Sequence, residues 1–174
     1  MKRRHGLLGA GFGLLLLVAG VASTEAPMVE DPCIQEVHSL HRFFVDWFTG
    51  HLANDHVAFA RVEAALDESF QIIGPDGRLQ ARAELLPMLA EAYGSRADRD
   101  FRIEIRRPRK RRLGDHLCLV TYEEWQYDRS GTRAWQSSAL LERHAGAPGG
   151  WVWLHVHETL LPAEIVASDA GNDG

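Results

Sequence analysis

The spacing of hydrophobic residues changes once along this chain, near residue 100, and this change limits the folds open to it. Before that point apolar side chains recur every three to four residues, which is the period of an amphipathic helix. After it they alternate in four runs, residues 101–107, 116–127, 133–143 and 151–161, as in strands with one buried face. Helices followed by a meander of long antiparallel strands indicate an α+β fold, with the helices packed on one face of a curved sheet.

The first two predicted helices have clear start signals. Asp31 is a good N-cap and Pro32 a good first helical residue, and the apolar stripe that follows them continues to Gly50. Either Asn54 or Asp55 caps the second helix. Both helices are therefore expected to precede the sheet.

Residues 27–162 are predicted to form a single domain. A short strand at residues 70–73 and a third helix at about residues 83–93 complete its first half. The chain has 174 residues, of which 45% are hydrophobic and 25% charged, so one core is expected at this length. The small and acidic segment 163–174 is predicted to be a flexible tail.

The first 26 residues have the order of a secretory signal peptide. Three basic residues at positions 2–4 precede an apolar stretch from Gly6 to Ala22, and small residues follow it up to Ala26. This stretch of 17 residues includes five glycines and is short for a membrane-spanning helix. We therefore predict a periplasmic or secreted protein, which contacts a membrane only if this segment stays uncleaved.

The chain has two cysteines, Cys33 and Cys118. Export to an oxidising compartment allows them to form a disulfide, which would stabilise the fold by roughly 3–5 kcal/mol because it closes a long loop. The alternative is that both are small buried hydrophobic side chains.

Charge is unevenly distributed along the chain. The net charge is −5, which argues against a dedicated nucleic-acid binder. Residues 106–112 nevertheless hold six basic side chains in seven positions. This run is expected to be a solvated hairpin tip between two strands, and the alternative is a surface that attracts anionic partners.

The chain passes through a helix pair, the segment LDESFQIIGPDG at residues 66–77, a third helix, a meander and the closing strand WVWLHVHET at residues 151–159. This order resembles the nuclear transport factor 2-like (NTF2-like) superfamily, and within it the SnoaL-like and related bacterial families. The resemblance covers roughly residues 33–162. It implies a cone-shaped sheet wrapped around a long helix, a pocket at the wide end, and a homodimer formed through the sheet. The superfamily includes ketosteroid isomerase and polyketide cyclases as well as members that only bind or associate, so no activity follows from the fold alone.

Alternate residues of the closing strand share a face. The resemblance places one face inside the cone, and we expect it to be the face that carries His155 and His157. Two imidazoles about 7 Å apart can orient a polar group of a ligand or move a proton, which makes them candidate catalytic residues. The alternative is that they fill a polar end of the core. The ligand-binding residues expected on the same face are Trp151, Trp153 and Thr159.

Histidines at alternate strand positions can also meet one metal ion. No third ligand follows these two in an obvious position. We therefore predict no metal site and no cofactor.

The hairpin between the second and third alternating runs offers partners for the histidines. With a three-residue loop, Glu124 pairs with Gln136 and Tyr122 with Ser138 on one face, whereas a two-residue turn shifts every pair by one. A carboxylate and a tyrosine two positions apart can perform acid-base chemistry, so Glu124 and Tyr122 are candidate catalytic residues. The alternative is a solvated or interface face with a stray glutamate. The candidate ligand-binding residues of this hairpin are Trp135 and Gln136.

The isomerase and cyclase members of the superfamily place an acidic base in the cone. By resemblance, Asp46, Glu123 and Glu124 are the candidates for that base. The helical phase of Asp46 places it away from the apolar stripe and favours exposure.

Three functions remain open. The preferred one is an exported domain that binds a small, partly apolar ligand in its cone. The second is an isomerase, dehydratase or cyclase that acts by general acid-base catalysis. The third is a dimeric association module whose cone is filled by its own side chains, and a filled cone would separate it from the other two.

Overall fold

The computed structural model of this chain describes residues 31–170. The predicted signal peptide, residues 1–26, lies outside the described residues, and so do residues 171–174. The helices are α1 (Pro32–Phe48), α2 (His56–Ala65), α3 (Arg82–Glu91) and α4 (Ala163–Ala170), with a short 3-10 turn, η1 (Pro148–Gly150). The strands are β1 (Leu66–Ile73), β2 (Leu79–Ala81), β3 (Arg102–Leu113), β4 (Leu117–Asp128), β5 (Gly131–Arg143) and β6 (Trp151–Leu160).

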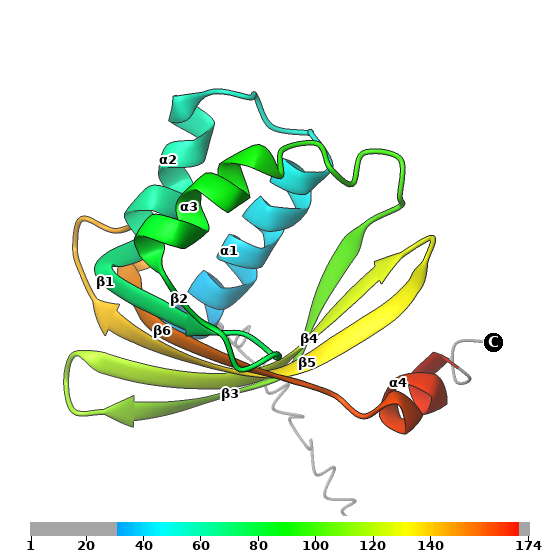
Figure 1. Ribbon diagram of the computed structural model, residues 1–174. Helices are drawn as coiled ribbons and strands as arrows, with labels where there is room; N and C mark the ends of the chain where they lie inside the picture. Colours follow the sequence, from blue (N-terminus) through cyan, green and yellow to red (C-terminus); the bar gives the residue numbers. More distant parts are fainter. Residues whose placement is uncertain (1–30, 171–174) are drawn as a thin grey trace, which may run out of the picture.

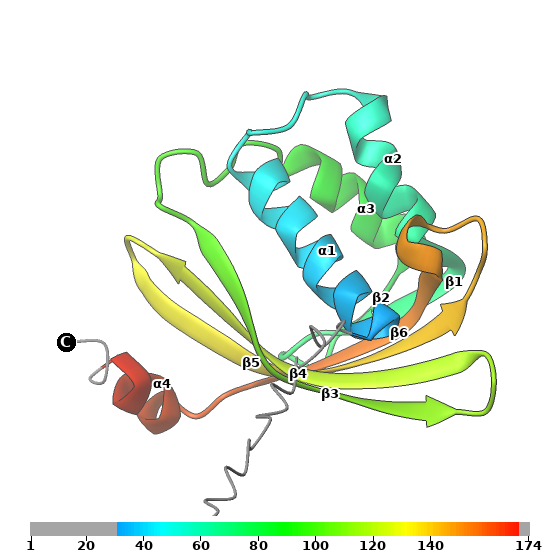
Figure 2. The same ribbon diagram turned by 180° about the vertical axis from the view of Figure 1, so that it is seen from behind.

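The six strands form one sheet in the order β2-β1-β6-β5-β4-β3. Only β1 and β6 pair in parallel, and every other neighbouring pair of strands is antiparallel. The sheet curves, with α1, α2 and α3 on its concave side and α4 away from them (Figures 1 and 2). This arrangement confirms the predicted α+β fold.

Helix α1 is the central element of the concave side. Asp31 caps it through its side chain, which accepts a hydrogen bond of 3.1 Å from the backbone N–H of Cys33, and Pro32 begins its first turn. At the other end Trp47 is buried and donates a 2.8 Å hydrogen bond to the carbonyl of Leu89 in α3. The helix therefore holds α3 at one end and approaches the sheet at the other.

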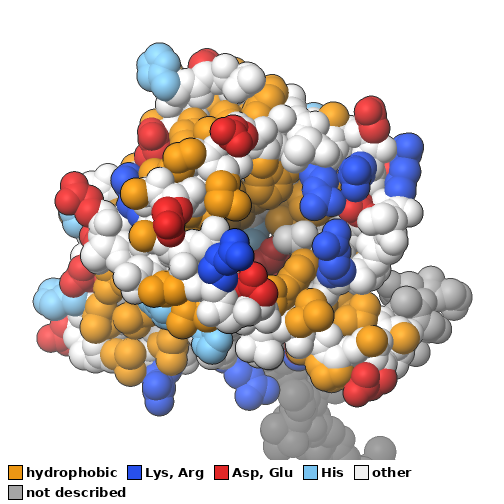
Figure 3. Space-filling model, in the orientation of Figure 1, with side chains coloured by type: hydrophobic (Ala, Val, Ile, Leu, Met, Phe, Trp, Pro, Cys, Tyr) orange, Lys and Arg blue, Asp and Glu red, His pale blue; other side chains and the backbone are white. Residues whose placement is uncertain are grey.

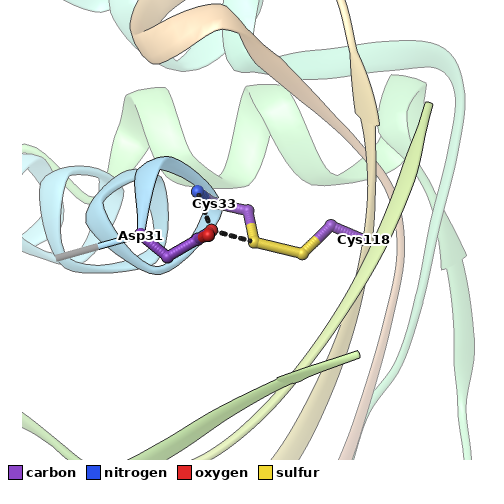
Figure 4. Close-up of side chains that lie close together, drawn as sticks. All are labelled: Asp31, Cys33 and Cys118. Atoms are coloured by element: carbon purple, nitrogen blue, oxygen red, sulfur yellow. Dashed lines mark hydrogen bonds between the residues drawn. A yellow bond between two sulfur atoms is a disulfide. The ribbon is translucent and has the colours of Figure 1, made fainter. Parts of the chain in front are cut away.

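A disulfide joins the start of α1 to strand β4. Cys33 and Cys118 are fully buried, their Cα atoms are 6.7 Å apart, and 85 positions separate them in sequence. The carboxylate of Asp31 lies beside the Cys33 sulfur (Figure 4). These three residues are close enough to resemble a metal-ligand set. Because both sulfurs are bonded to each other, they offer no thiolate to an ion. Of the two alternatives for the cysteines, the structure has the disulfide.

The basic run lies within an edge strand, not at a hairpin tip as expected. Strand β3 continues to Leu113, so Arg106 and residues 109–112 pair with β4. The pairing register shifts between Arg106 and Arg109, around Pro108, which donates no hydrogen bond to the ladder. A proline at a bulge of an edge strand explains how the strand continues where the sequence indicated a loop.

The end of the described chain is more ordered than the predicted flexible tail. Residues Ala163–Ala170 form α4, and Asp169 in it makes an ion pair of 2.5 Å with Arg106 of β3. None of the helices within residues 31–170 has the length and apolar character needed to cross a membrane.

Candidate ligand-binding site

A cavity of about 180 Å³ lies between the concave side of the sheet and helices α1 and α3. Its polar lining consists of His41, Tyr122, Glu124, Gln126 and Glu158. The apolar lining consists of Leu40, Phe44, Phe48, Leu66, Phe70, Ile72, Leu85, Leu89, Ile103, Trp153 and Val156. In the space-filling view this face is hollowed near its centre, with hydrophobic side chains beside the hollow and Lys or Arg side chains on the surface around it (Figure 3). No Lys or Arg belongs to the described lining.

His41 and Glu124 form a buried pair on one wall of the cavity. Nδ1 of His41 lies 2.7 Å from the carbonyl oxygen of Val37, which can only accept, so Nδ1 carries a proton. Nε2 lies 3.1 Å from Oε2 of Glu124, and the side chain of Gln126 donates a 2.7 Å hydrogen bond to Oε1. One proton is therefore held between His41 and Glu124, and the pair has no net charge in either position of that proton.

The electrostatics of this pair favour the ionic form. Burial opposes charge on both groups, but the carboxylate raises the pKa of His41 above its ordinary value. Burial likewise works to raise the pKa of Glu124, and His41 lowers it below the usual range. We therefore describe the pair as imidazolium and carboxylate.

Glu158 is the second carboxyl group of the cavity and makes no hydrogen bond to any described residue. Burial, helped by the charge of Glu124, raises its pKa to about 7. In the sheet it pairs with Ser137, which in turn pairs with Tyr122. Ser137 is fully buried, and its hydroxyl interacts with that of Tyr122. The titratable acid Glu158 therefore lies next to a buried hydroxyl in the sheet.

A separate buried cluster, which we call the Glu36 cluster, consists of Glu36, Arg61 and Trp153. Nη2 of Arg61 donates to both carboxylate oxygens of Glu36 at 2.9 Å, and Nε1 of Trp153 donates to Oε1 at 3.1 Å. Gly149 packs against it, because a Cβ atom there would lie 2.6 Å from Oε2 of Glu36. The Glu36 carboxylate is therefore enclosed by Arg61, Trp153 and Gly149.

Residues 34–162 match the family described as sucrose-6-phosphate phosphohydrolase C-terminal. The chain belongs to this family. No protein with a curated description matches it.

Solved structures similar to this family member have the NTF2-like fold. An NTF-2 like protein of unknown function from Pseudomonas aeruginosa is 25% identical, with a TM-score of 0.68, over 76% of this chain and 100% of that one. An NTF2-like protein of unknown function in nutrient uptake from Rhodospirillum rubrum is 15% identical, with a TM-score of 0.55, over 76% of this chain and 100% of that one. The CaMKII hub of S. rosetta is 17% identical, with a TM-score of 0.57, over 78% of this chain and 100% of that one. These similarities confirm the NTF2-like fold.

Three of the residues proposed from sequence line the cavity of this member of the sucrose-6-phosphate phosphohydrolase C-terminal family. They are Tyr122, Glu124 and Trp153. Trp151 is buried elsewhere, with the guanidinium groups of Arg112 and Arg143 over its ring.

The prediction that His155 and His157 face into the cone was wrong. Leu141 pairs with Trp153 but Leu140 pairs with His155, so one extra residue, Leu154, forms a bulge. Beyond the bulge the alternation is reversed, and the residues that line the cavity are Val156 and Glu158. The two residues displaced with His155 to the convex side are His157 and Thr159.

The predicted pairing between the two strands of the middle hairpin, β4 and β5, was also wrong by one residue. Asp128 pairs with Gly131 across a two-residue turn, so Tyr122 pairs with Ser137 and Glu124 with Trp135. This is the shorter of the two turns weighed from sequence. This turn moves Gln136 and Ser138 to the convex side. Trp135 pairs with Glu124 but does not line the cavity.

The other candidate bases do not line the cavity. Asp46 lies on α1 with its side chain 39% exposed, as its helical phase indicated. Glu123 lies on the convex side, where Arg107 and the indole of Trp125 donate to it.

Three cavity residues were missed as site residues. His41 lies within the apolar stripe predicted between Pro32 and Gly50, and a polar side chain within such a stripe indicates a hydrogen-bond partner in the core. Glu158 lies between His157 and Thr159, so the predicted alternation placed it on the outer face of β6. Gln126 lies two positions beyond Glu124 on β4, so the same alternation that placed Glu124 could have placed it.

Proposed function

We propose that this chain is an exported domain that binds a small, largely apolar molecule in its cone. The observation that carries the proposal is the open cavity, which the surrounding side chains do not fill. Its volume of about 180 Å³ exceeds the roughly 150 Å³ that holds benzene in an engineered protein cavity. A six-membered ring with one polar substituent is the size of ligand that it suits.

The chemistry of the lining argues against a sugar phosphate as that ligand. The family to which the chain belongs is described by reference to a sucrose-6-phosphate phosphohydrolase. Phosphate is bound by Arg, Lys or backbone N–H groups. The described lining has two glutamates and no Lys or Arg, and it is mostly apolar.

An acid-base enzyme is the second candidate function. The observation that favours it is a proton held between His41 and Glu124, beside a Glu158 carboxyl whose pKa is raised to about 7. Two titratable groups with different pKa values in one apolar pocket are suited to isomerase or dehydratase chemistry. In that case His41 and Glu158 take the place we assigned to His155 and His157.

Association through the convex face of the sheet is compatible with both functions. Among the similar structures is a CaMKII hub domain. In this chain that face carries His155 and His157. A homodimer formed there would leave the cavity on the opposite side of the sheet.

Native mass spectrometry of the protein taken from its exported fraction tests the main proposal. We expect a defined co-purifying mass, which is lost in a Leu85→Trp variant that fills the cavity. Met88→Trp is the matched control, because Met88 lies on the same helix and is 54% exposed. A bare polypeptide that also binds no small cyclic compound would favour the association module, and recovery only from the cytoplasm would contradict export.

A further inference from the structure

The polar groups that line the cavity differ in how many hydrogen-bonding atoms they leave free for a ligand. Both oxygens of Glu124 are occupied, one by His41 and one by Gln126. His41 itself uses both ring nitrogens. Glu158 has a carboxyl group with no hydrogen-bond partner among the described residues. It is therefore the group most available to bind a ligand.

The walls around Glu158 favour positive charge. The His41–Glu124 pair is neutral as a whole, so an ionised Glu158 makes the cavity negative. Aromatic rings of Phe44, Phe70, Tyr122 and Trp153 contribute to the lining, and ring faces attract cations. No described Lys or Arg lines the cavity to balance an anion.

We propose that the ligand is a small organic cation, a protonated amine on an apolar ring or chain, held by the carboxylate of Glu158. This inference rests on the proposed ligand-binding function and names its chemical class. The apolar body occupies the wall formed by α1, α3 and β1, and the ammonium group donates to Glu158.

The affinity of the cavity for an amine should increase as pH rises. The titratable groups that face Glu158 are His41 from α1 and Tyr122 and Glu124 from β4, while α3 and β1 contribute only apolar side chains to the lining. Since the pKa of Glu158 is about 7 in the empty site, the carboxylate fraction rises from about one tenth at pH 6 to about nine tenths at pH 8. Affinity for an amine is expected to rise about tenfold over that interval, because only the ionised site is competent.

Three probes of one shape test this directly: cyclohexylamine, cyclohexanol and cyclohexanecarboxylate, titrated into the full chain by calorimetry at pH 6 and pH 8. We expect cyclohexylamine to bind at least tenfold more tightly than cyclohexanol at pH 8. In Glu158→Gln that preference should disappear while cyclohexanol still binds. Glu142→Gln, at an exposed position of β5, is the matched control and should behave as wild type.

Each other outcome decides against a specific claim. If cyclohexanol binds as tightly as the amine, the site is apolar only, and the proposed binding function survives without the cation. If cyclohexanecarboxylate binds best and weakens as pH rises, a protonated Glu158 is the donor and the cation proposal is wrong. If no probe binds, both proposals fail. The wild-type pH comparison keeps the test intact should Glu158→Gln fail to fold.

Discussion

Two buried acidic sites lie against the same helix, and they are built differently. In the Glu36 cluster the carboxylate is held by Arg61 and Trp153 and packed against Gly149. At the cavity, Glu124 is held by a histidine. Arginine does not release its proton at any physiological pH, whereas histidine and a carboxyl near pH 7 do. The Glu36 cluster is therefore suited to holding the fold together, whereas the cavity is suited to exchanging protons and admitting a ligand.

The largest effect is expected at the disulfide beside the Glu36 cluster, three residues before Glu36 in α1. A Cys33→Ala/Cys118→Ala variant should lose roughly 4–5 kcal/mol of unfolding free energy, because a cross-link across 85 positions removes much of the entropy of the unfolded chain. Urea denaturation of the oxidised protein measures this loss. An unchanged midpoint in the variant would show that the cross-link does not contribute.

Breaking the Glu36 cluster itself should cost about 3 kcal/mol. Glu36→Gln leaves the Arg61 guanidinium without its counter-charge, and one of its nitrogens is already buried without a partner. The double variant Glu36→Gln/Arg61→Met should recover most of that loss, since it removes the isolated charge. Glu63→Gln, at an exposed position of α2, is the control in the same denaturation series. Equal stability of Glu36→Gln and Glu63→Gln would contradict a structural role for the pair.

The stability contributed by the cavity should depend on pH near neutrality. The pKa of Glu158 is raised from its ordinary 4.5 to about 7, so the folded state binds this proton more tightly than the unfolded state. The stability from Glu158 is therefore complete below about pH 4.5 and is lost as pH rises through 7. Between pH 5 and pH 8 the wild type should lose on the order of 2 kcal/mol relative to Glu158→Gln, as measured by thermal unfolding. If the stability of the two proteins changes equally with pH, the pKa of Glu158 is not raised in the folded state.

The smallest effect is expected on the convex side of the sheet. His155→Ala/His157→Ala should change the unfolding free energy by less than about 0.5 kcal/mol each, and it should leave cyclohexylamine binding unchanged. Calorimetry on the variant checks both points. A loss of binding would restore these histidines to the site.

Hydrophobic periodicity was sufficient to predict the first three helices, the meander and the fold class, because it records which face of each element is buried. It did not predict α4, where a flexible tail was expected. It did not predict faces across irregularities. The Leu154 bulge lies in an alternating run without Gly or Pro to mark it, and the turn at residues 129–130 differs from the expected loop by one residue. A shift of one residue exchanges the two faces of a strand. Tyr122 and Glu124 were found because their strand is regular up to that turn.

The position of His41 in an apolar stripe indicated a buried partner, but nothing in the sequence identified Glu124 as that partner. The two residues are 83 positions apart. Only the packing of α1 into the curve of the sheet brings them within 3.1 Å. Buried polar pairs of this kind depend on tertiary structure, so a single sequence shows the candidates and not the partnership.

The strand order leaves two open edges, and open edges are where separate chains join into aggregates. One edge, β2, is three residues long and offers little to pair with. The other, β3, is twelve residues long and would be a strong template if it were neutral. Of its six basic side chains between residues 106 and 112, four form ion pairs with acidic residues. Arg109 and Arg111 form none among the described residues, and they repel an identical strand from a second molecule. The basic run, which carries no assigned function, therefore helps to keep the protein dispersed at high concentration.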